Sequence, residues 1–405
     1  GVNTATTAEG AVAISAEAKA RTSYSIAIGR NATAGGDMVP PSNETGAAIA
    51  IGRNSLSNFI GAVALGNGAT VSPAKSDGNA TDGIAIGTKA LVDSYRGMAI
   101  GANSQAKGSQ SIVLANNVPG AKLSTASGIR SQVYGVESEV SGSNSVAMGS
   151  TNTVASARTY AIGNNINVAA GADDSLVFGT QANVGAVHSI AMGTTAAATG
   201  TGSIALGKSA SATEQRAIAM GENALAGNEA SMALGYNSSA KGSKQVSIGL
   251  GAGALKNATD AGAELATFVG HYAGADNASP TGNVQGVAVG VNAGRYGVSG
   301  IRNVAVGPST GQKVEGDDNT AIGYNSGRGV KGTNNFAGGA NAGVFVEGNN
   351  NVALGFNAGI GADGNPLKVN RTTAVGSNSR ALADDSVALG DHAIANNANS
   401  VAIGT

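Results

Sequence analysis

The sequence predicts an all-β solenoid, a parallel β-roll of about 24 coils, on three observations. A short apolar segment that closes with glycine, such as "SIAIG" (25–29) or "SVAIG" (400–404), returns along the whole chain of 405 residues. From Gly179 to Gly249 the closing glycines follow one another at a constant step of 14 residues. The 63 glycines, the 3% aromatic content and the lack of tryptophan and cysteine argue against ordinary globular cores. Repeats of this kind bury their apolar faces only against their neighbours.

Each repeat is predicted to hold two short parallel strands joined by two tight turns. The glycine-closed segments are rich in β-branched residues and bounded by glycine and polar residues, as is typical of strands. Fourteen residues accommodate two strands of about five residues each, whereas helical repeats need more than twice that length. Neighbouring coils then stack about 4.8 Å apart.

The second strand of the repeat is predicted to have one face in water. In "SIALGKSASATEQ", Ala210 and Ala212 share one face, and Ser209, Ser211 and Thr213 share the other. This alternation of small and polar residues has the period of two that a half-buried strand requires.

The first strand, by contrast, has no polar face, since Ile204 and Leu206 point one way and Ala205 the other. The coil interior covers only one face, so identical chains are expected to cover the second in a parallel cyclic homo-oligomer. Turns of about two residues bring the sheets closer than the usual 10 Å, which favours alanine inside. The interior alanines are then Ala27, Ala50, Ala85, Ala205 and Ala219. The inter-chain axis receives the larger neighbours Ile26, Ile28, Ile49, Ile51, Ile204, Leu206, Ile218 and Met220. The opposite assignment is the alternative.

The glycine-closed segments and the alternating second strand, repeated together at this step, resemble a known family. The segments "SVAMG" (145–149), "SIALG" (203–207) and "SVALG" (386–390) are similar to the YadA-like head repeats of trimeric autotransporter adhesins. The resemblance extends over essentially the whole chain. It implies a left-handed roll, a homotrimer, and display on a Gram-negative outer membrane as the distal head of an adhesin. The family's stalk and membrane anchor are expected outside this sequence, which stops at "SVAIGT" before any neck motif.

Three sections of one continuous rod are expected. Residues 1–248 carry 14-residue coils with three loop insertions, and residues 376–405 return to that step. Residues 249–375 carry longer coils in which "GYNSG" (323–327) and its relatives place a second glycine four residues after the first. Such a glycine suggests a bulge or a corner that needs a positive φ.

Six turn-rich insertions interrupt the repeats and are predicted to be surface loops. Insertions on one side of a repeat protein often form its binding face, although variable decoration is the simpler interpretation. The candidate ligand-binding residues on these loops are Met38, Pro40, Asn43, Lys75, Asn79, Lys122, Asn257, Asn277, Lys368 and Arg371.

Composition and motifs exclude several function classes. The net charge of −1 offers no basic surface for nucleic acid. The three histidines lie far apart, so we expect no metal site within one chain, and no cofactor motif occurs. A hexapeptide-type acyltransferase would need a six-residue period and a catalytic histidine. No segment combines an acid, a base and a nucleophile, so no enzymatic activity is expected.

The predicted function is therefore attachment at the bacterial cell surface. A homotrimeric head presents three identical faces, so individually weak contacts add through multivalency. The expected partners are extracellular matrix proteins, host receptors, other cells or abiotic surfaces, with the membrane reached only through regions outside this chain. The alternative is a structural spacer of a surface or phage-type fibre that presents another binding domain.

Overall fold

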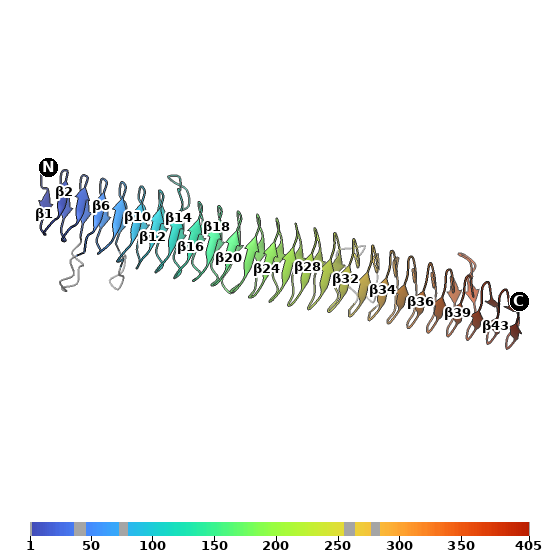
Figure 1. The fold of residues 1–405 in the computed structure, drawn as a ribbon. Helices are drawn as coiled ribbons and strands as arrows, with labels where there is room; N and C mark the ends of the chain where they lie inside the picture. Colours follow the sequence, from blue (N-terminus) through green and yellow to red (C-terminus); the bar gives the residue numbers. More distant parts are fainter. Residues whose placement is uncertain (1, 36–45, 73–79, 255–263, 277–283, 405) are drawn as a thin grey trace. The chain divides into compact units, whose positions relative to one another are not determined.

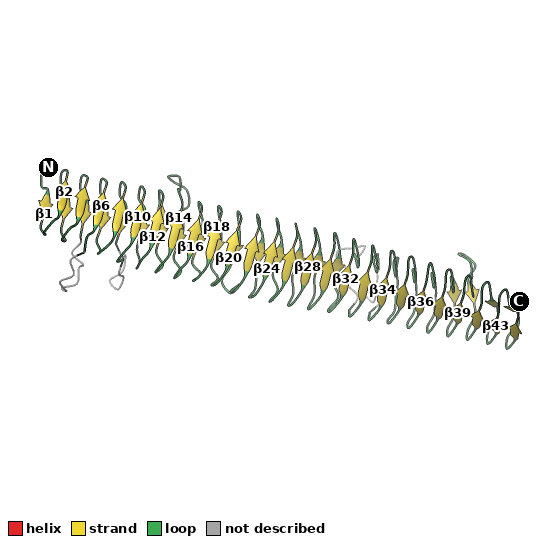
Figure 2. Ribbon diagram, in the orientation of Figure 1, coloured by secondary structure: helices red, strands yellow, loops and turns green. Residues whose placement is uncertain are grey.

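The computed structural model describes residues 2–35, 46–72, 80–254, 264–276 and 284–404. The chain divides into two compact units, residues 1–195 and 196–405. Within each unit, short parallel strands stack coil upon coil (Figure 1). Throughout the described ranges the chain forms strands, turns and loops but no helix, as Figure 2 shows. The predicted all-β parallel solenoid is confirmed.

In the first unit, the glycine-closed segments form one parallel sheet of 12 strands. The sheet pairs equivalent positions of successive coils, for example Ile84 with Met98 and Ile86 with Ile100. Its strands are β2 (Val12–Ile14), β4 (Ile26–Ile28), β6 (Ile49–Ile51), β8 (Val63–Leu65), β10 (Ile84–Ile86), β12 (Met98–Ile100), β14 (Ile112–Leu114), β16 (Gln132–Tyr134), β18 (Val146–Met148), β20 (Tyr160–Ile162), β22 (Leu176–Phe178) and β24 (Ile190–Met192).

The second strands of the first unit form the facing parallel sheet. These strands are β1 (Ala5–Thr6), β3 (Lys19–Ala20), β5 (Thr33–Ala34), β7 (Leu56–Ser57), β9 (Thr70–Val71), β11 (Leu91–Val92), β13 (Ser104–Ala106), β15 (Ser124–Ala126), β17 (Glu139–Val140), β19 (Thr153–Val154) and β21 (Asn167–Val168), with β23 (Asn183–Val184) beside β21.

The second unit repeats this arrangement with 13 glycine-closed strands. They are β26 (Ile204–Leu206), β28 (Ile218–Met220), β30 (Met232–Leu234), β32 (Val246–Ile248), β33 (Thr267–Val269), β34 (Val287–Val289), β35 (Val304–Val306), β36 (Thr320–Ile322), β37 (Phe336–Gly338), β39 (Val352–Leu354), β41 (Thr373–Val375), β43 (Val387–Leu389) and β45 (Val401–Ile403). Together with the first unit, this total lies close to the predicted 24 coils.

The facing strands of the second unit are less regular. At its start they form a parallel sheet of β25 (Ala197–Ala198), β27 (Ser211–Ala212), β29 (Leu225–Ala226) and β31 (Ser239–Ala240). In the longer coils the pairing shrinks to single bridges such as Glu315 to Lys331. Regular pairs return with β38 (Val346–Glu347) and β40 (Leu367–Lys368), and with β42 (Arg380–Ala381) and β44 (Ile394–Ala395).

Alanine predominates in the narrow interior, as the sequence predicts. The five alanines assigned to the interior are fully buried within one chain. In the second strand Ala210 and Ala212 are also fully buried, whereas Ser211 and Thr213 face outward. In these coils the two sheets meet through alanine side chains, whereas in other coils the same interior positions hold valine, for example Val92 and Val133.

The predicted strand length of about five residues is wrong. The first strands span three residues and the second strands two or three, because each corner takes four or five residues instead of two. Each corner also contains a residue in the left-handed region, for example Ser209 (φ 56°) and Arg216 (φ 57°). Two such reversals in every coil leave little extended chain between them.

The longer coils contain a second row of buried side chains that the described 14-residue coils lack. Their extra glycines adopt a positive φ, as expected for a corner, for example 59° at Gly327. Beyond this corner, Val298, Val314 and Val330 pack together as a separate apolar cluster. The residue directly before β35, β36, β37 and β39 is a buried asparagine.

Candidate adhesive surfaces

The outer face of the first strands is a long apolar surface in each unit. The residues assigned to the inter-chain axis point away from the buried alanines and form ladders, such as Ile26 beside Ile49 and Leu206 beside Met220. They are half-buried or exposed in the single chain, with Met220 41% exposed. We call the two outward positions of all these strands, from Val12 and Ile14 to Val401 and Ile403, the outer apolar face.

No charged residue interrupts the outer apolar face. Neither outward position of any described first strand is Asp, Glu, Lys or Arg, and polar exceptions such as Thr267 and Thr373 are few. Monomeric soluble proteins rarely expose contiguous apolar surface of more than a few hundred Å². An uncovered surface of this extent is typical of a protein that buries it against a partner.

A second apolar row lies in the second unit, and the sequence analysis did not identify it. The position just after the closing glycine holds Tyr236, Leu250, Val291, Tyr324 and Phe356, which are 42–60% exposed. His271, Pro308 and Ala340 occupy the intervening coils. The same position is polar in most other coils, where it holds residues such as Arg30, Lys208, Glu222 and Asp391. The row becomes visible in the sequence when the repeats are aligned on their closing glycines.

Seven of the ten loop candidates lie outside the described residues: Met38, Pro40, Asn43, Lys75, Asn79, Asn257 and Asn277. Each of the other three forms an ion pair within the chain. Lys122 Nζ lies 3.4 Å from Glu139 Oε2, and Lys368 Nζ lies 3.3 Å from Glu347 Oε2. Arg371 donates to both carboxylate oxygens of Asp385, at 2.6 and 2.8 Å. These three cations are therefore not brought together into one site.

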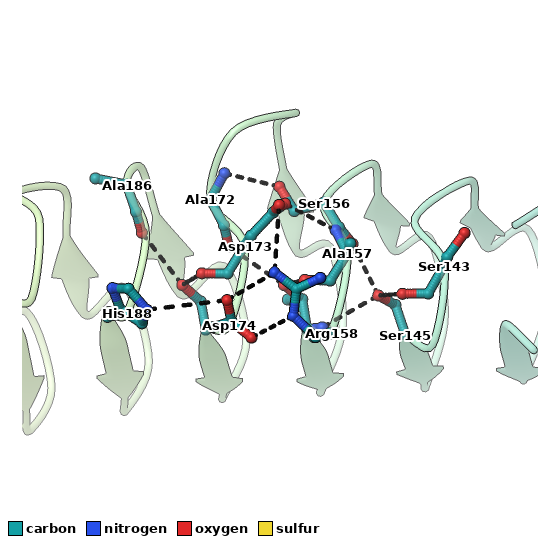
Figure 3. Close-up of polar contacts among 12 residues, drawn as sticks. Ser143, Ser145, Ser156, Ala157, Arg158, Ala172, Asp173, Asp174, Ala186 and His188 are labelled. Atoms are coloured by element: carbon teal, nitrogen blue, oxygen red, sulfur yellow. Dashed lines mark hydrogen bonds and ion pairs between the residues drawn. The ribbon is translucent and has the colours of Figure 1, made fainter.

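A charged ladder stabilises the corner that precedes the first strand (Figure 3). The guanidinium of Arg158 donates to both oxygens of Asp174 on the next coil, from Nε at 2.5 Å and from Nη2 at 2.8 Å. His188, one coil further, places Nε2 3.9 Å from Asp174 Oδ2. Arg302 and Asp318 form the same two-bond contact at the same corner of longer coils.

These contacts shift the acidity of the carboxyl groups. The hydrogen bond from Arg158 lowers the pKa of Asp174, and the positive charge of Arg158 acts in the same direction. The pKa values of Asp318 and Asp385 are lowered by their arginine partners in the same way. These ion pairs connect consecutive coils. Because each arginine is already paired with an aspartate of the same chain, the pairs are not available to bind a ligand.

A cation held between two aromatic rings lies at the base of one insertion. Arg295 lies 4.3 Å from the ring centroid of Tyr272 and 4.4 Å from that of Tyr296. Its Nε donates to Asp276 Oδ2 at 2.8 Å, and Nη1 donates to Asn292 Oδ1 at 2.9 Å. With a side chain only 19% exposed, Arg295 is a structural clamp and not a docking residue.

The described ranges contain no group of three or more His, Asp or Glu side chains placed to bind a metal ion. His188 and His392 each have a single carboxylate neighbour. In the same ranges, no helix has the length and apolar character needed to cross a bilayer. The surfaces that this chain offers are therefore apolar ladders, polar corners and loops.

Comparison with known proteins gives one family. The model of the YadA head domain repeat matches in both units, at residues 16–37, 47–69, 93–114, 170–196, 198–224, 212–238, 226–252, 370–393 and 383–405. No curated protein matches the chain. The matches fall on the 14-residue coils, whereas the longer coils between residues 253 and 369 lie outside them.

Proposed function

This chain is a YadA-like head made of the repeats of that family, and from this we propose that it is the adhesive head of a homotrimeric cell-surface protein. The family supports an adhesin-like function. The proposal adds that three chains associate in parallel through the outer apolar face, with the left-handed winding that the family implies.

The outer apolar face is the observation that carries the trimer. Its residues alternate with alanines that are already fully buried inside one chain, so the coil itself has no means of covering them. Each aliphatic side chain moved from water into an apolar interface contributes about 1.5 to 3 kcal/mol when fully buried. Repeated over the 12 and 13 strands of the two units, this term outweighs what surface ion pairs supply.

The polar surface left by such a trimer supports attachment. Outward residues of the second strands stay accessible when the outer apolar face is covered, and threefold repetition multiplies weak contacts. We propose that this surface binds extracellular matrix, host receptors, other cells or abiotic surfaces. Anchoring at the bacterial outer membrane is proposed through regions outside this sequence.

Adhesion is tested with beads that carry the purified chain. We expect such beads to attach to immobilised collagen, fibronectin or laminin, or to host-cell monolayers, more strongly than beads carrying an unrelated trimeric protein. If the coated beads attach to none of these above that control, the spacer function replaces the adhesive one.

A further inference from the structure

A loop follows β39 in the second unit (Figure 1). Beside this loop lies a surface cavity of about 460 Å³. This volume is within the range of roughly 300 to 1,000 Å³ that is common for small-molecule sites. Its walls come from three parts of the chain: Asn357 and Asn378 at successive corners, Arg380 on β42, and the loop residues 360–362 and 365–367. No other charged side chain lines it.

The loop wall is a hydrogen-bonded hairpin. The amides of Ala362 and Asn365 each donate to the carbonyl of the other, at 3.1 and 3.0 Å, around a two-residue Asp-Gly turn. At its base Gly361 donates to the Val344 carbonyl at 2.8 Å, and Leu367 donates to the Phe345 carbonyl at 2.9 Å. Backbone hydrogen bonds to the preceding coil thus hold the wall in place before any ligand arrives.

The polar side chains of the cavity retain hydrogen-bonding capacity. Asn357 Nδ2 donates to Asn378 Oδ1 at 3.2 Å, while Asn357 Oδ1 accepts from Asn341 Nδ2 at 3.1 Å. A carboxamide has two donor hydrogens and two acceptor lone pairs, so Asn357 keeps one of each for a ligand. Asn365 uses only its backbone in the hairpin.

Arg380 supplies the positive charge of the cavity. Among the described residues its guanidinium forms no ion pair, unlike that of Arg371, which is paired with Asp385. Arg380 is exposed and lies between the buried Ser379 and Ala381, so its side chain projects from the outside of the second strand. The cavity therefore stays open when the outer apolar face of the first strands is covered.

We propose that this cavity binds a carboxylate-bearing sugar residue of an acidic oligosaccharide. A guanidinium recognises a carboxylate through two parallel hydrogen bonds. Carboxamides, which both donate and accept, match the hydroxyl groups of a sugar ring. Ile360, Pro366 and Leu367 provide the apolar surface on which the C–H face of the ring packs. This inference names a ligand class for the proposed adhesive function, and it rests on that proposed function.

Titration calorimetry on the full chain tests the proposal with matched probes. These are sialyllactose against lactose, and a glucuronate-terminated disaccharide against its glucose-terminated counterpart. We expect at least one acidic sugar to bind at least tenfold more tightly than its neutral partner. R380Q should weaken that binding by roughly tenfold or more, as expected for a lost charge-assisted hydrogen-bond pair.

Two further variants sharpen the result. N365D places a negative charge at the exposed hairpin wall and should also weaken binding, whereas R216Q makes the same charge change as R380Q on a distant exposed corner and should leave it unchanged. Equal binding of acidic and neutral sugars, or unchanged binding by R380Q, overturns the proposal. Competition by acetate at the same concentration overturns it as well, because the site then recognises a bare carboxylate.

A negative result in the titration and a negative result in the bead assay contradict different hypotheses. A chain that attaches to host surfaces and binds no acidic sugar contradicts only the cavity assignment. A chain that binds the sugar and mediates no attachment contradicts only the adhesive function.

Discussion

At the scale of single residues, the closing glycines are the positions where the backbone leaves the least freedom. Gly235 has φ 130°, and a Cβ placed on it would lie 2.6 Å from the backbone carbonyl oxygen of Gly249. Gly202 also has a positive φ, 64°, but a Cβ there would meet nothing within 4 Å. A substitution at Gly202 therefore introduces backbone strain alone, whereas one at Gly235 adds a steric clash between coils.

Gly235→Ala is expected to lower the free energy of unfolding far more than Gly202→Ala. The second substitution pays only for the left-handed conformation, about 1–2 kcal/mol. The first adds a contact with backbone that cannot move without separating two coils, and should cost at least about 2 kcal/mol more. Urea unfolding of both variants at equal protein concentration measures the difference, and equal midpoints would contradict the clash.

The arginine-paired aspartates set the response of the fold to acid. The folded-state pKa values of Asp174, Asp318 and Asp385 are lowered by their arginines. Their stabilisation is therefore complete above the unfolded-state pKa of about 3.9 and is lost as the pH falls through the lower folded-state values. The melting temperature should vary little from pH 7 to about pH 5 on this account and fall below about pH 4.

A triple variant tests this assignment. Replacing the three aspartates with asparagine keeps a residue type that tolerates the left-handed φ of these positions, and should flatten the fall in melting temperature below about pH 4. Glu214→Gln, an exposed control, should leave the fall unchanged. The same steep fall in the triple variant would assign acid sensitivity to other groups.

At the scale of elements, a buried ladder of asparagines stabilises the longer coils. Asn335 Nδ2 donates to Asn319 Oδ1 and to the Gly348 carbonyl, both at 2.9 Å. Its Oδ1 accepts from the backbone amide and from Nδ2 of Asn351, at 3.1 and 3.0 Å. Asn303 begins the same ladder with an identical contact to Asn319. These asparagines occupy the position that holds a buried serine, such as Ser203, in the 14-residue coils.

Asn335→Ala should therefore be among the costly substitutions of the longer coils. It leaves donors and acceptors of two neighbouring coils buried without partners, at about 1–3 kcal/mol for each group left unsatisfied. The exposed Asn396→Ala should change stability by less than about 0.5 kcal/mol. Urea unfolding compares the two, and a mild effect at Asn335 would show that water replaces the ladder.

At the scale of the whole molecule, the outer apolar face predicts self-association. Ile204→Lys together with Ile218→Lys places two charges in a surface that contains none, and should dissociate the complex or lower its stability sharply. Ser211→Lys adds a charge on the outward side of the second strand and should be tolerated.

Sedimentation equilibrium measures the outcome. The unaltered chain and the Ser211→Lys variant should sediment as a trimer of three times 39.0 kDa, about 117 kDa, and the double variant at a lower mass. A folded monomer for the unaltered chain would remove the main physical support for the trimer.

Much of the repeat was predictable because its constraints are local. The period of two within "SIALG" distinguishes Ala205 from Ile204 and Leu206, and the structure buries the alanine and turns the larger side chains outward. The strand lengths were not predictable in the same way, since each corner requires a left-handed residue that serine or arginine supplies as well as glycine. The buried asparagine ladder was overlooked, although its 16-residue step from Asn303 to Asn351 is visible in the sequence.

The period of the coil, its strand order, its alanine-rich interior and its resemblance to a head repeat could all be predicted from the sequence, because each depends on residues within one or two turns of chain. The contacts between side chains of different coils were revealed only by the three-dimensional structure. The pairing of Arg158 with Asp174, the clamp around Arg295 and the cavity beside Arg380 join residues of different coils. Such contacts depend on how insertions and corners stack across the coils, and no local pattern specifies that.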